Sequence, residues 1–318
     1  MSEVRSGNGV KKIRRKLDGV LLLDKPIGMS SNQALQAARR ILNAQKGGHT
    51  GTLDPLATGL LPLCFGEATK FAGELLGADK TYSATLKLGI TTDTGDAEGR
   101  EVLRREVSVT RADVLAALAH FLGVIDQVPP MYSALKRDGK PLYEYARAGI
   151  EVERKSRAVT IRELVMTDWA GDQVSIDVTC SKGTYIRTLA EDIGERLGCG
   201  AHLVALRRTA TGGMSVASAV SLAALEVMSE SQRDAALLPV DALIAHLPAL
   251  HLEEDVGASV MHGQGFEIDK GKFNGVSSAP TGEIDRRVRL IDHEGHFLGL
   301  GTTNQDGWCQ PLRLIASN

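Results

Sequence analysis

Apolar and polar side chains alternate over residues 80–89 and 174–180, and this pattern predicts half-buried β-strands. In the first stretch the apolar positions are Tyr82, Ala84, Leu86 and Leu88, and the polar positions are Thr81, Ser83, Thr85 and Lys87. The second stretch alternates Val174, Ile176, Val178 and Cys180. We expect another strand over 159–166. An apolar run at 20–23, which stops at Asp24-Lys25-Pro26, predicts a buried strand that ends in a loop.

Apolar residues at helical spacing predict helices between these strands. The first begins after Ser30 or Ser31, either of which can cap it. Its apolar face consists of Ala34, Leu35, Ala38, Ile41 and Leu42. We expect a short helix after Phe65-Gly66 and an amphipathic helix over 111–122. Thr188 and Glu191 have the spacing of a capping box, which predicts that Arg187 lies just ahead of a helix start.

Three polar segments interrupt these elements. Residues 46–59, KGGHTGTLDPLATG, have no helical or strand period and are interpreted as an ordered loop. The acidic segment 91–99, TTDTGDAEG, lacks the ligand pattern of a calcium loop and is interpreted as a solvated turn. Residues 126–157 are polar and rich in proline, which predicts a long functional or mobile insertion rather than core.

The pattern of apolar and polar residues changes near Leu250. Short β-like runs then alternate with turns and predict a small β-rich C-terminal domain. Helices and alternating strands without regular βαβ punctuation favour the α+β class, with a mixed, largely antiparallel sheet flanked by helices. We therefore expect a basic flexible tail at 1–16, a catalytic domain at 17–248 with its insertion at 128–157, and a C-terminal domain at 249–318.

Composition narrows the class of protein. The chain is 43% hydrophobic and 24% charged, as is typical of soluble globular proteins, and no apolar run approaches the roughly 20 residues of a membrane helix. The basic N-terminus lacks the apolar stretch of a secretory signal, so we expect a cytoplasmic protein. Its four cysteines, at 64, 180, 199 and 309, are scattered and predict buried free thiols rather than a metal site.

Charge alone does not establish a nucleic-acid partner. The formal net charge is −2, whereas such proteins are usually basic, and the segment from Ala249 onward holds six basic and ten acidic residues. The predicted insertion is different, because basic and aromatic side chains interleave there, a composition that suits RNA as well as a merely solvated loop. These side chains are Tyr132, Lys136, Arg137, Lys140, Tyr143, Tyr145, Arg147, Arg154, Lys155 and Arg157.

Asp54 is the candidate for chemistry. An Asp-Pro pair in a loop usually forms a turn in which the carboxylate binds nearby backbone amides. Here glycines at 47, 48, 51 and 59 allow the backbone to approach a ligand closely, and His49 and Thr50 add polar groups. Spacing alone allows a general base, a nucleophile or a metal ligand. The sequence has no phosphate-binding loop and no dinucleotide fingerprint.

The segment HTGTLDPLATGLLP resembles the catalytic-loop motif of the TruB family of tRNA pseudouridine-55 synthases. Four further blocks resemble motifs of that family in the same order, from Gly19 to Thr209. They are LLLDKPIGMSSNQAL, DKTYSATLKLGITTDTGDAEG, VPPMYSALKRDGKPLYEYARAGI, which resembles an RNA-clasping insertion, and CSKGTYIRTLAEDIGERLGCGAHLVALRRT. ASVMHGQGFEI resembles the opening turn of the PUA-like domain with which the family often ends.

The resemblance implies a role for each matched residue. Asp54 matches the aspartate that attacks during isomerisation, Tyr82 the aromatic that stacks on the flipped base, and Arg187 the arginine that pairs with the catalytic carboxylate. His49 matches a histidine near the extruded nucleotide. Three further residues match supporting positions in the pocket: Lys25, Lys70 and Tyr185. Without the resemblance, Tyr82 is interpreted as a core aromatic and Arg187 as a surface arginine.

The resemblance also implies an activity, the isomerisation of uridine 55 in the T-arm of tRNA by base flipping and Asp54-dependent exchange of the glycosidic bond. It implies no metal or other cofactor, a tRNA T-arm stem-loop as partner, and a monomer without an obligate protein partner. Two alternatives stay open, an RNA chaperone that opens the tRNA elbow and a carboxylate hydrolase such as a nucleosidase. Such hydrolases usually place two acids around the scissile bond, and only Asp54 stands out here.

Overall fold

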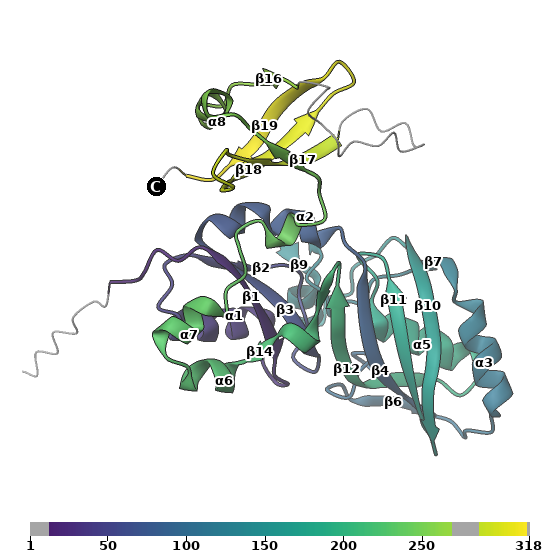
Figure 1. Cartoon of the computed structure of the whole chain (residues 1–318). Helices are drawn as coiled ribbons and strands as arrows, with labels where there is room; N and C mark the ends of the chain where they lie inside the picture. Colours follow the sequence, from purple (N-terminus) through teal and green to yellow (C-terminus); the bar gives the residue numbers. More distant parts are fainter. Residues whose placement is uncertain (1–12, 269–285, 317–318) are drawn as a thin grey trace, which may run out of the picture.

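The computed structural model describes residues 13–268 and 286–316. One mixed sheet runs through the larger part of the molecule (Figure 1). Its strands are β1 (Gly19–Lys25), β2 (Gly47–His49), β3 (Thr58–Phe65), β4 (Lys80–Leu88), β7 (Gly123–Gln127), β10 (Arg157–Ala170), β11 (Gln173–Cys180), β12 (Ala201–Thr211), β13 (Met214–Ser215) and β14 (Val220–Ser221).

The strands lie in the order β14-β1-β3-β12-β4-β11-β10-β7, with β2 added beside β3 and β13 beside β12. Within this sheet β1 pairs with β14 and β3 with β12 in parallel, and the other described pairs are antiparallel. The predicted α+β class with a mixed, largely antiparallel sheet is therefore confirmed.

Strand β4 lies between β12 and β11 and shows the predicted alternation. Its buried positions are those of Tyr82, Ala84, Leu86 and Leu88, together with Lys80. On the opposite face polar side chains meet across the β4–β11 ladder: the hydroxyls of Thr81 and Thr179 hydrogen-bond to each other, and the Ser83 hydroxyl donates to the Asp177 carboxylate. One face of the strand therefore supplies the core, and the other carries a polar surface.

The helices are α1 (Ser31–Ile41), α2 (Ala72–Leu76), α3 (Arg111–His120), α4 (Leu142–Arg147), α5 (Ile186–Arg196), α6 (Leu222–Val227), α7 (Glu230–Ala235) and α8 (Glu254–Met261), with 3₁₀ turns η1 (Gly66–Phe71), η2 (Val216–Ser218) and η3 (Ala242–Ile244). Helices α1, α3 and α5 pack on one face of the sheet in a common core. Ser30 caps α1 through a capping box with Gln33, as predicted for one of the two serines.

The predicted start of α5 is wrong. The helix begins at Ile186 with Tyr185 as its N-cap, so Thr188 and Arg187 both lie inside the first turn. The Tyr185 backbone amide is bound by the side chain of Gln127, and this distant partner replaces the local cap that we expected. As a result Arg187 is 5% exposed and projects from a buried turn rather than from a surface loop.

Two predicted loops also differ from expectation. Residues 47–49 form the short strand β2 against β3, with Gly47 opposite Phe65, and a Cβ at Gly47 would lie 3.2 Å from that ring. The acidic segment closes a hairpin between β5 (Ile90–Thr92) and β6 (Glu101–Arg104) and is only partly the solvated turn that we expected, since Asp93, Ala97 and Glu98 are exposed but Asp96 is buried. Asp96 is 3% exposed there, because its carboxylate accepts from the Thr94 hydroxyl and the Glu98 amide and faces a buried arginine.

The insertion leaves the sheet where β7 meets β10, since Gln127 is opposite Arg157. It contains a small hairpin of β8 (Lys136–Arg137) and β9 (Lys140–Pro141), followed by α4. The Arg154 guanidinium donates to the Pro129 carbonyl at 3.1 Å and joins the two ends of the segment. The insertion therefore has its own secondary structure. Both of its ends are anchored in the sheet, where β7 pairs with β10.

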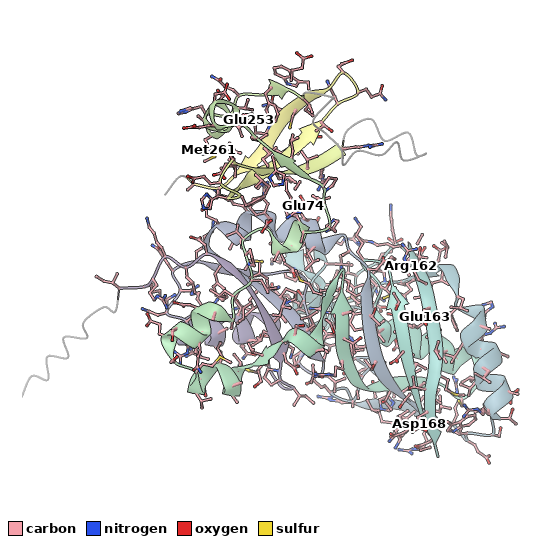
Figure 2. All side chains as sticks on the ribbon, viewed as in Figure 1. Glu74, Arg162, Glu163, Asp168, Glu253 and Met261 are labelled. Atoms are coloured by element: carbon pink, nitrogen blue, oxygen red, sulfur yellow. The ribbon has the colours of Figure 1, made fainter. Side chains whose placement is uncertain are left out.

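A second, smaller sheet forms the β-rich C-terminal region, as predicted. It comprises β15 (Ala249–His251), β17 (Arg286–Ile291), β18 (Phe297–Thr303), β19 (Trp308–Leu314) and β16 (Phe266–Glu267) in that order. It sits against η1 and α2 (Figure 1), where the Phe71 and Phe297 rings meet edge to face at 5.2 Å. Glu74 stands at this junction (Figure 2) and pairs with Arg287.

Residues 1–12 of the predicted flexible tail lie outside the described residues. Arg15 near its end is docked, because its backbone binds Asn43 and Gln45 and its guanidinium pairs with Asp234 at 2.7 Å. All four cysteines are free and buried, as expected. Within the described ranges we find no helix with the length and apolar character needed to cross a membrane.

Candidate active site

Asp54 lies in the loop between β2 and β3, where backbone contacts fix its position. The Ser31 hydroxyl both donates to the Leu53 carbonyl and accepts from the Leu53 amide, which ties the loop to the start of α1. The Asp54 carbonyl accepts from Ala57, and the Pro55 carbonyl accepts from Gly28. The Asp54 side chain remains 41% accessible, so a ligand can reach the carboxylate.

Arg187 reaches Asp54 from the first turn of α5. Its Nη2 lies 2.9 Å from Asp54 Oδ2, and its Nη1 lies 3.6 Å from Asp96 Oδ2. The same two nitrogens donate to backbone carbonyls, Nη1 to Thr94 at 2.9 Å and Nη2 to Tyr132 at 2.7 Å. The guanidinium is thus held from three segments, and its fixed fork sets the orientation of the Asp54 carboxylate.

Opposing influences act on the Asp54 carboxyl. Although one side of the carboxyl stays open to a ligand, the surrounding protein removes much of its solvation and raises its pKa above the ordinary value, and the negative charge of Asp96 acts in the same direction. The positive charges of Arg187 and Lys25 oppose this rise. Removal of either cation would therefore favour the protonated acid, which cannot act as a nucleophile or base.

Lys25 is fully buried at the end of β1. Its ammonium donates to the carbonyls of Pro26 at 2.8 Å and Met29 at 2.5 Å. Burial lowers the pKa of Lys25 to about 8, although the charges of Asp54 and Glu98 oppose that shift. The ammonium is therefore close to losing its proton at mildly alkaline pH.

Tyr82 lies on the buried face of β4 with 9% of its surface exposed. Arg208 is directly opposite it on β12, and this guanidinium opposes the rise in the Tyr82 pKa that burial causes. Burial lowers the pKa of His49 in β2, and the charge of Arg208 lowers it further. One buried arginine therefore influences two of the predicted site residues.

Arg208 itself is 1% exposed, and its Nε donates to the Leu60 carbonyl at 2.7 Å. Its Nη2 is buried without a hydrogen-bond partner among the residues that the structure describes. Gly59 permits this arrangement, because at φ +96° a Cβ would lie 2.3 Å from the Arg208 carbonyl oxygen. Only glycine lets β3 and β12 approach this closely.

The structure brings together six of the seven predicted site residues. Tyr185 caps α5 beside Arg187, and burial raises the pKa of its phenol. Lys70 is not part of the cluster. Its ammonium binds Glu67 at 2.6 Å and the Leu314 carbonyl at 2.9 Å, so it lies in the contact with the C-terminal region. The expected pocket position of Lys70 is therefore wrong, because its side chain turns along η1 toward that region.

Sequence reasoning missed three residues that build the site. Asp96 was assigned to a solvated turn, although an aspartate with glycine and threonine neighbours can also be bound by its own turn and face inward. Arg208 is one of two adjacent arginines, and alternation along β12 could have separated the exposed Arg207 from its buried neighbour. For Gln127 the sequence carries no signal that we recognise.

A cavity of about 570 Å³ opens on the polar face of β4, β11 and β12. It reaches Ile27, in the loop between β1 and α1, and Leu56, which follows Asp54 in its own loop. Its walls carry Ser83, Asp177 and Arg207 among other residues, and the Arg207 guanidinium pairs with Asp24 at 2.7 Å. The Asp54 loop is thus bordered by a groove with hydrogen-bonding walls.

The fold is also found in solved structures of two complexes. The chain superposes on a solved archaeal box H/ACA sRNP Nop10-Cbf5 complex with a TM-score of 0.68 at 24% identity, covering 95% of this chain and 87% of that one. A Cbf5-Nop10-Gar1 complex gives a TM-score of 0.67 at 25% identity, with 94% and 84% covered. The chain therefore shares its fold with the matched chains of these two complexes.

Sequence comparisons define the family. The TruB family pseudouridylate synthase N-terminal domain matches residues 39–186, the tRNA pseudouridylate synthase B C-terminal domain 187–245, and the pseudouridine synthase II TruB C-terminal domain 248–315. The tRNA pseudouridine synthase B of Azoarcus sp. (strain BH72) is 59% identical over 304 residues, 96% of this chain and 97% of the relative. The protein of that name from Burkholderia mallei (strain NCTC 10247) is 55% identical over 304 residues, 96% and 99%. The chain belongs to the TruB family of pseudouridine synthases.

Proposed function

We propose that this protein converts uridine 55 in the T-arm of tRNA to pseudouridine, with Asp54 as the catalytic residue. The observation that carries the proposal is the accessible Asp54 carboxylate, held at 2.9 Å by a buried arginine in a TruB-family fold. Relatives that share more than half of its residues over nearly their whole length are named tRNA pseudouridine synthase B.

The chemistry needs no change of oxidation state. The bond between N1 of uracil and C1′ of ribose breaks, the ring turns, and a bond between C5 and C1′ forms. C5 loses its hydrogen as a proton to water, and N1 gains a proton. Asp54 can act by adding to the ring or by attacking C1′, and both routes need an ionised carboxylate. Arg187 and Lys25 supply the positive charge that favours this ionised form.

The other side chains of the cluster have supporting roles. The target uridine must leave the RNA stack to reach Asp54, at a cost of a few kcal/mol. Tyr82 stacks on the extruded base, an interaction worth roughly 1–3 kcal/mol at comparable sites. His49 and Tyr185 line the space around it, and Lys25 holds the loop that precedes α1 through its bonds to Pro26 and Met29.

Contacts with RNA are assigned to the insertion. The Arg147 Cζ lies over the Tyr143 ring, 5.4 Å from its centre, within the range of a cation–π contact. Arginines and tyrosines of this kind bind phosphates and unstacked bases. The C-terminal region, interpreted as PUA-like, makes a narrower contact because acidic residues outnumber basic ones there. We propose that the protein acts on tRNA in the cytoplasm, as a monomer without an obligate protein partner.

A tritium-release assay tests the proposal. An unmodified tRNA transcript labelled with tritium at C5 of its uridines is incubated with the protein, and tritium in water is counted. Release of one equivalent per tRNA, with pseudouridine mapped to position 55, is the expected outcome. Tight binding without release would instead favour the RNA chaperone. Release of free uracil would identify a hydrolase.

A further inference from the structure

The base of the insertion touches the helix that carries Arg187. Gln127 is the last residue of β7, and it lies opposite Arg157, where the insertion returns to the sheet. Its side chain is 2% exposed and points to the N-cap of α5. The point where the insertion leaves the sheet therefore adjoins the start of α5.

The Gln127 side-chain amide forms two hydrogen bonds with the backbone of Tyr185, one as acceptor and one as donor. Its Oε1 accepts from the Tyr185 amide at 3.0 Å, and its Nε2 donates to the Tyr185 carbonyl at 3.3 Å. Only a side-chain amide can donate and accept with this spacing. The helix has no side-chain cap of its own, so Gln127 satisfies the N-cap amide that would otherwise be buried without a partner.

A second contact links the insertion to the same turn. The Tyr132 carbonyl accepts from Arg187 Nη2 at 2.7 Å, and the same nitrogen lies 2.9 Å from Asp54 Oδ2. Arg187 is therefore positioned by the insertion on one side and by the Thr94 carbonyl on the other. A shift of the α5 start would change the distance between Arg187 and the carboxylate.

We propose that Gln127 is a positioning residue for the reaction assigned above, because its amide fixes the start of α5 and so holds Arg187 against Asp54. The insertion and the Asp54–Arg187 pair are then mechanically connected. A shift of the insertion, to which we assign RNA binding, would change the position of Arg187 relative to the Asp54 carboxylate. This inference rests on the proposed function for its kinetic consequences, but its structural part can be measured without turnover.

The decisive variant is Gln127→Met, which keeps the length of the side chain and removes both hydrogen bonds. The control is Gln173→Met, because Gln173 is an exposed glutamine in β11. We expect the single-turnover rate of Gln127→Met to fall roughly ten- to hundredfold, since displacement of a catalytic arrangement by about 1 Å has effects of this size. Binding of T-arm RNA should change less than about twofold.

A rate loss alone would not separate positioning from local damage, so the pKa of Asp54 is the second measurement. The charged groups that face Asp54 are Arg187 from α5, Lys25 from β1, and Asp96 and Glu98 from the turn after β5. Displacement of Arg187 removes a charge that lowers the Asp54 pKa, so the ¹³C-detected titration and the acidic limb of the rate profile should both move to higher pH. Gln127→Asn, whose amide reaches less far, should show a smaller shift.

An Asp54 titration that coincides with the wild type in Gln127→Met would overturn the proposal, whether or not the rate falls. So would a wild-type rate in that variant. If Gln127→Met does not fold, Gln127→Asn is subject to the same two criteria. Failure of the proposed function has a different signature, because the wild-type protein itself would then release no tritium, while the Asp54 titration would still report on Gln127.

Discussion

Lys25 and Lys70 lie in two regions of the molecule that give their ammonium groups different environments. Lys25 is fully buried beside Asp54 and Glu98, and burial lowers its pKa to about 8. Lys70 keeps 31% of its side chain exposed in the contact with the C-terminal region, where it binds Glu67 and a backbone carbonyl. In the pocket a positive charge changes the protonation of neighbouring groups. At the junction solvent screens the charge of Lys70, and the lysine mainly holds the C-terminal region in place.

The largest effect should come from the centre of the pocket. Asp54→Asn keeps the shape of the side chain and removes its charge and nucleophilicity. We expect tritium release to fall by on the order of ten-thousandfold or more, as for other residues of a reacting centre. RNA binding, measured by filter retention, should stay within about threefold of the wild type, because we propose that the insertion makes most of the contacts with RNA. Tritium release near the wild-type rate would refute the role of Asp54.

Arg187→Met tests the partner of that carboxylate. We expect a loss of roughly 100- to 1,000-fold in the single-turnover rate, the range found when a preorganised donor is removed. The sign of the pH effect follows from its charge, since Arg187 lowers the Asp54 pKa and its removal raises that pKa. The ionised form is then lost at a higher pH, so the acidic limb of the profile should move upward. Arg162→Met, on the outer face of β10 (Figure 2), is the control and should leave the profile in place.

The two lysines provide a direct comparison. In Lys25→Met we expect the rate to fall about 10- to 100-fold, while Lys70→Met should change it less than about twofold. Wild-type activity should also decline as the pH rises through about 8, where the Lys25 ammonium loses its proton. Single-turnover rates at several pH values measure both effects. A larger loss in Lys70→Met than in Lys25→Met would reverse the distinction between the two regions.

Local patterns predicted the scaffold well. The alternation of β4 and the Ser30 capping box were readable because their determinants lie within a few residues. The start of α5 was not, since the partner of its N-cap is Gln127, at the far end of another strand. Asp96 was placed in solvent because its buried cation, Arg187, lies far away in the chain.

The site could be predicted only in part for the same reason. The family resemblance, which spans several blocks of the chain, identified Asp54 as the catalytic candidate and named the side chains that converge on it. It also named Lys70, whose side chain the fold directs elsewhere. Arg208 stayed unrecognised, because alternation separates two neighbouring arginines only once the strand and its register are known, and here the register depends on a β-bulge and on the glycine opposite Arg208. Side-chain direction depends on tertiary contacts that a motif does not contain.

Arg208 gives the smallest predicted effect. Its charge lowers the pKa of His49, after burial, and opposes the rise in the Tyr82 pKa. In Arg208→Met both pKa values should therefore rise, and the His49 imidazole should bind its proton at a higher pH than in the wild type. An NMR titration of the imidazole nitrogens measures this shift. Arg207→Met is the matched control, because Arg207 pairs with Asp24 on the other face of β12.

Stability provides an independent check on the same substitution. A buried guanidinium that has one nitrogen without a partner among the described residues costs free energy that a methionine of similar length does not. We therefore expect the free energy of unfolding of Arg208→Met to hold or to rise in urea titrations, even as the protonation of His49 changes. A large loss of stability would show that Arg208 mainly stabilises the fold, through its hydrogen bond to the Leu60 carbonyl. An unchanged His49 titration would remove it from the electrostatics of the pocket.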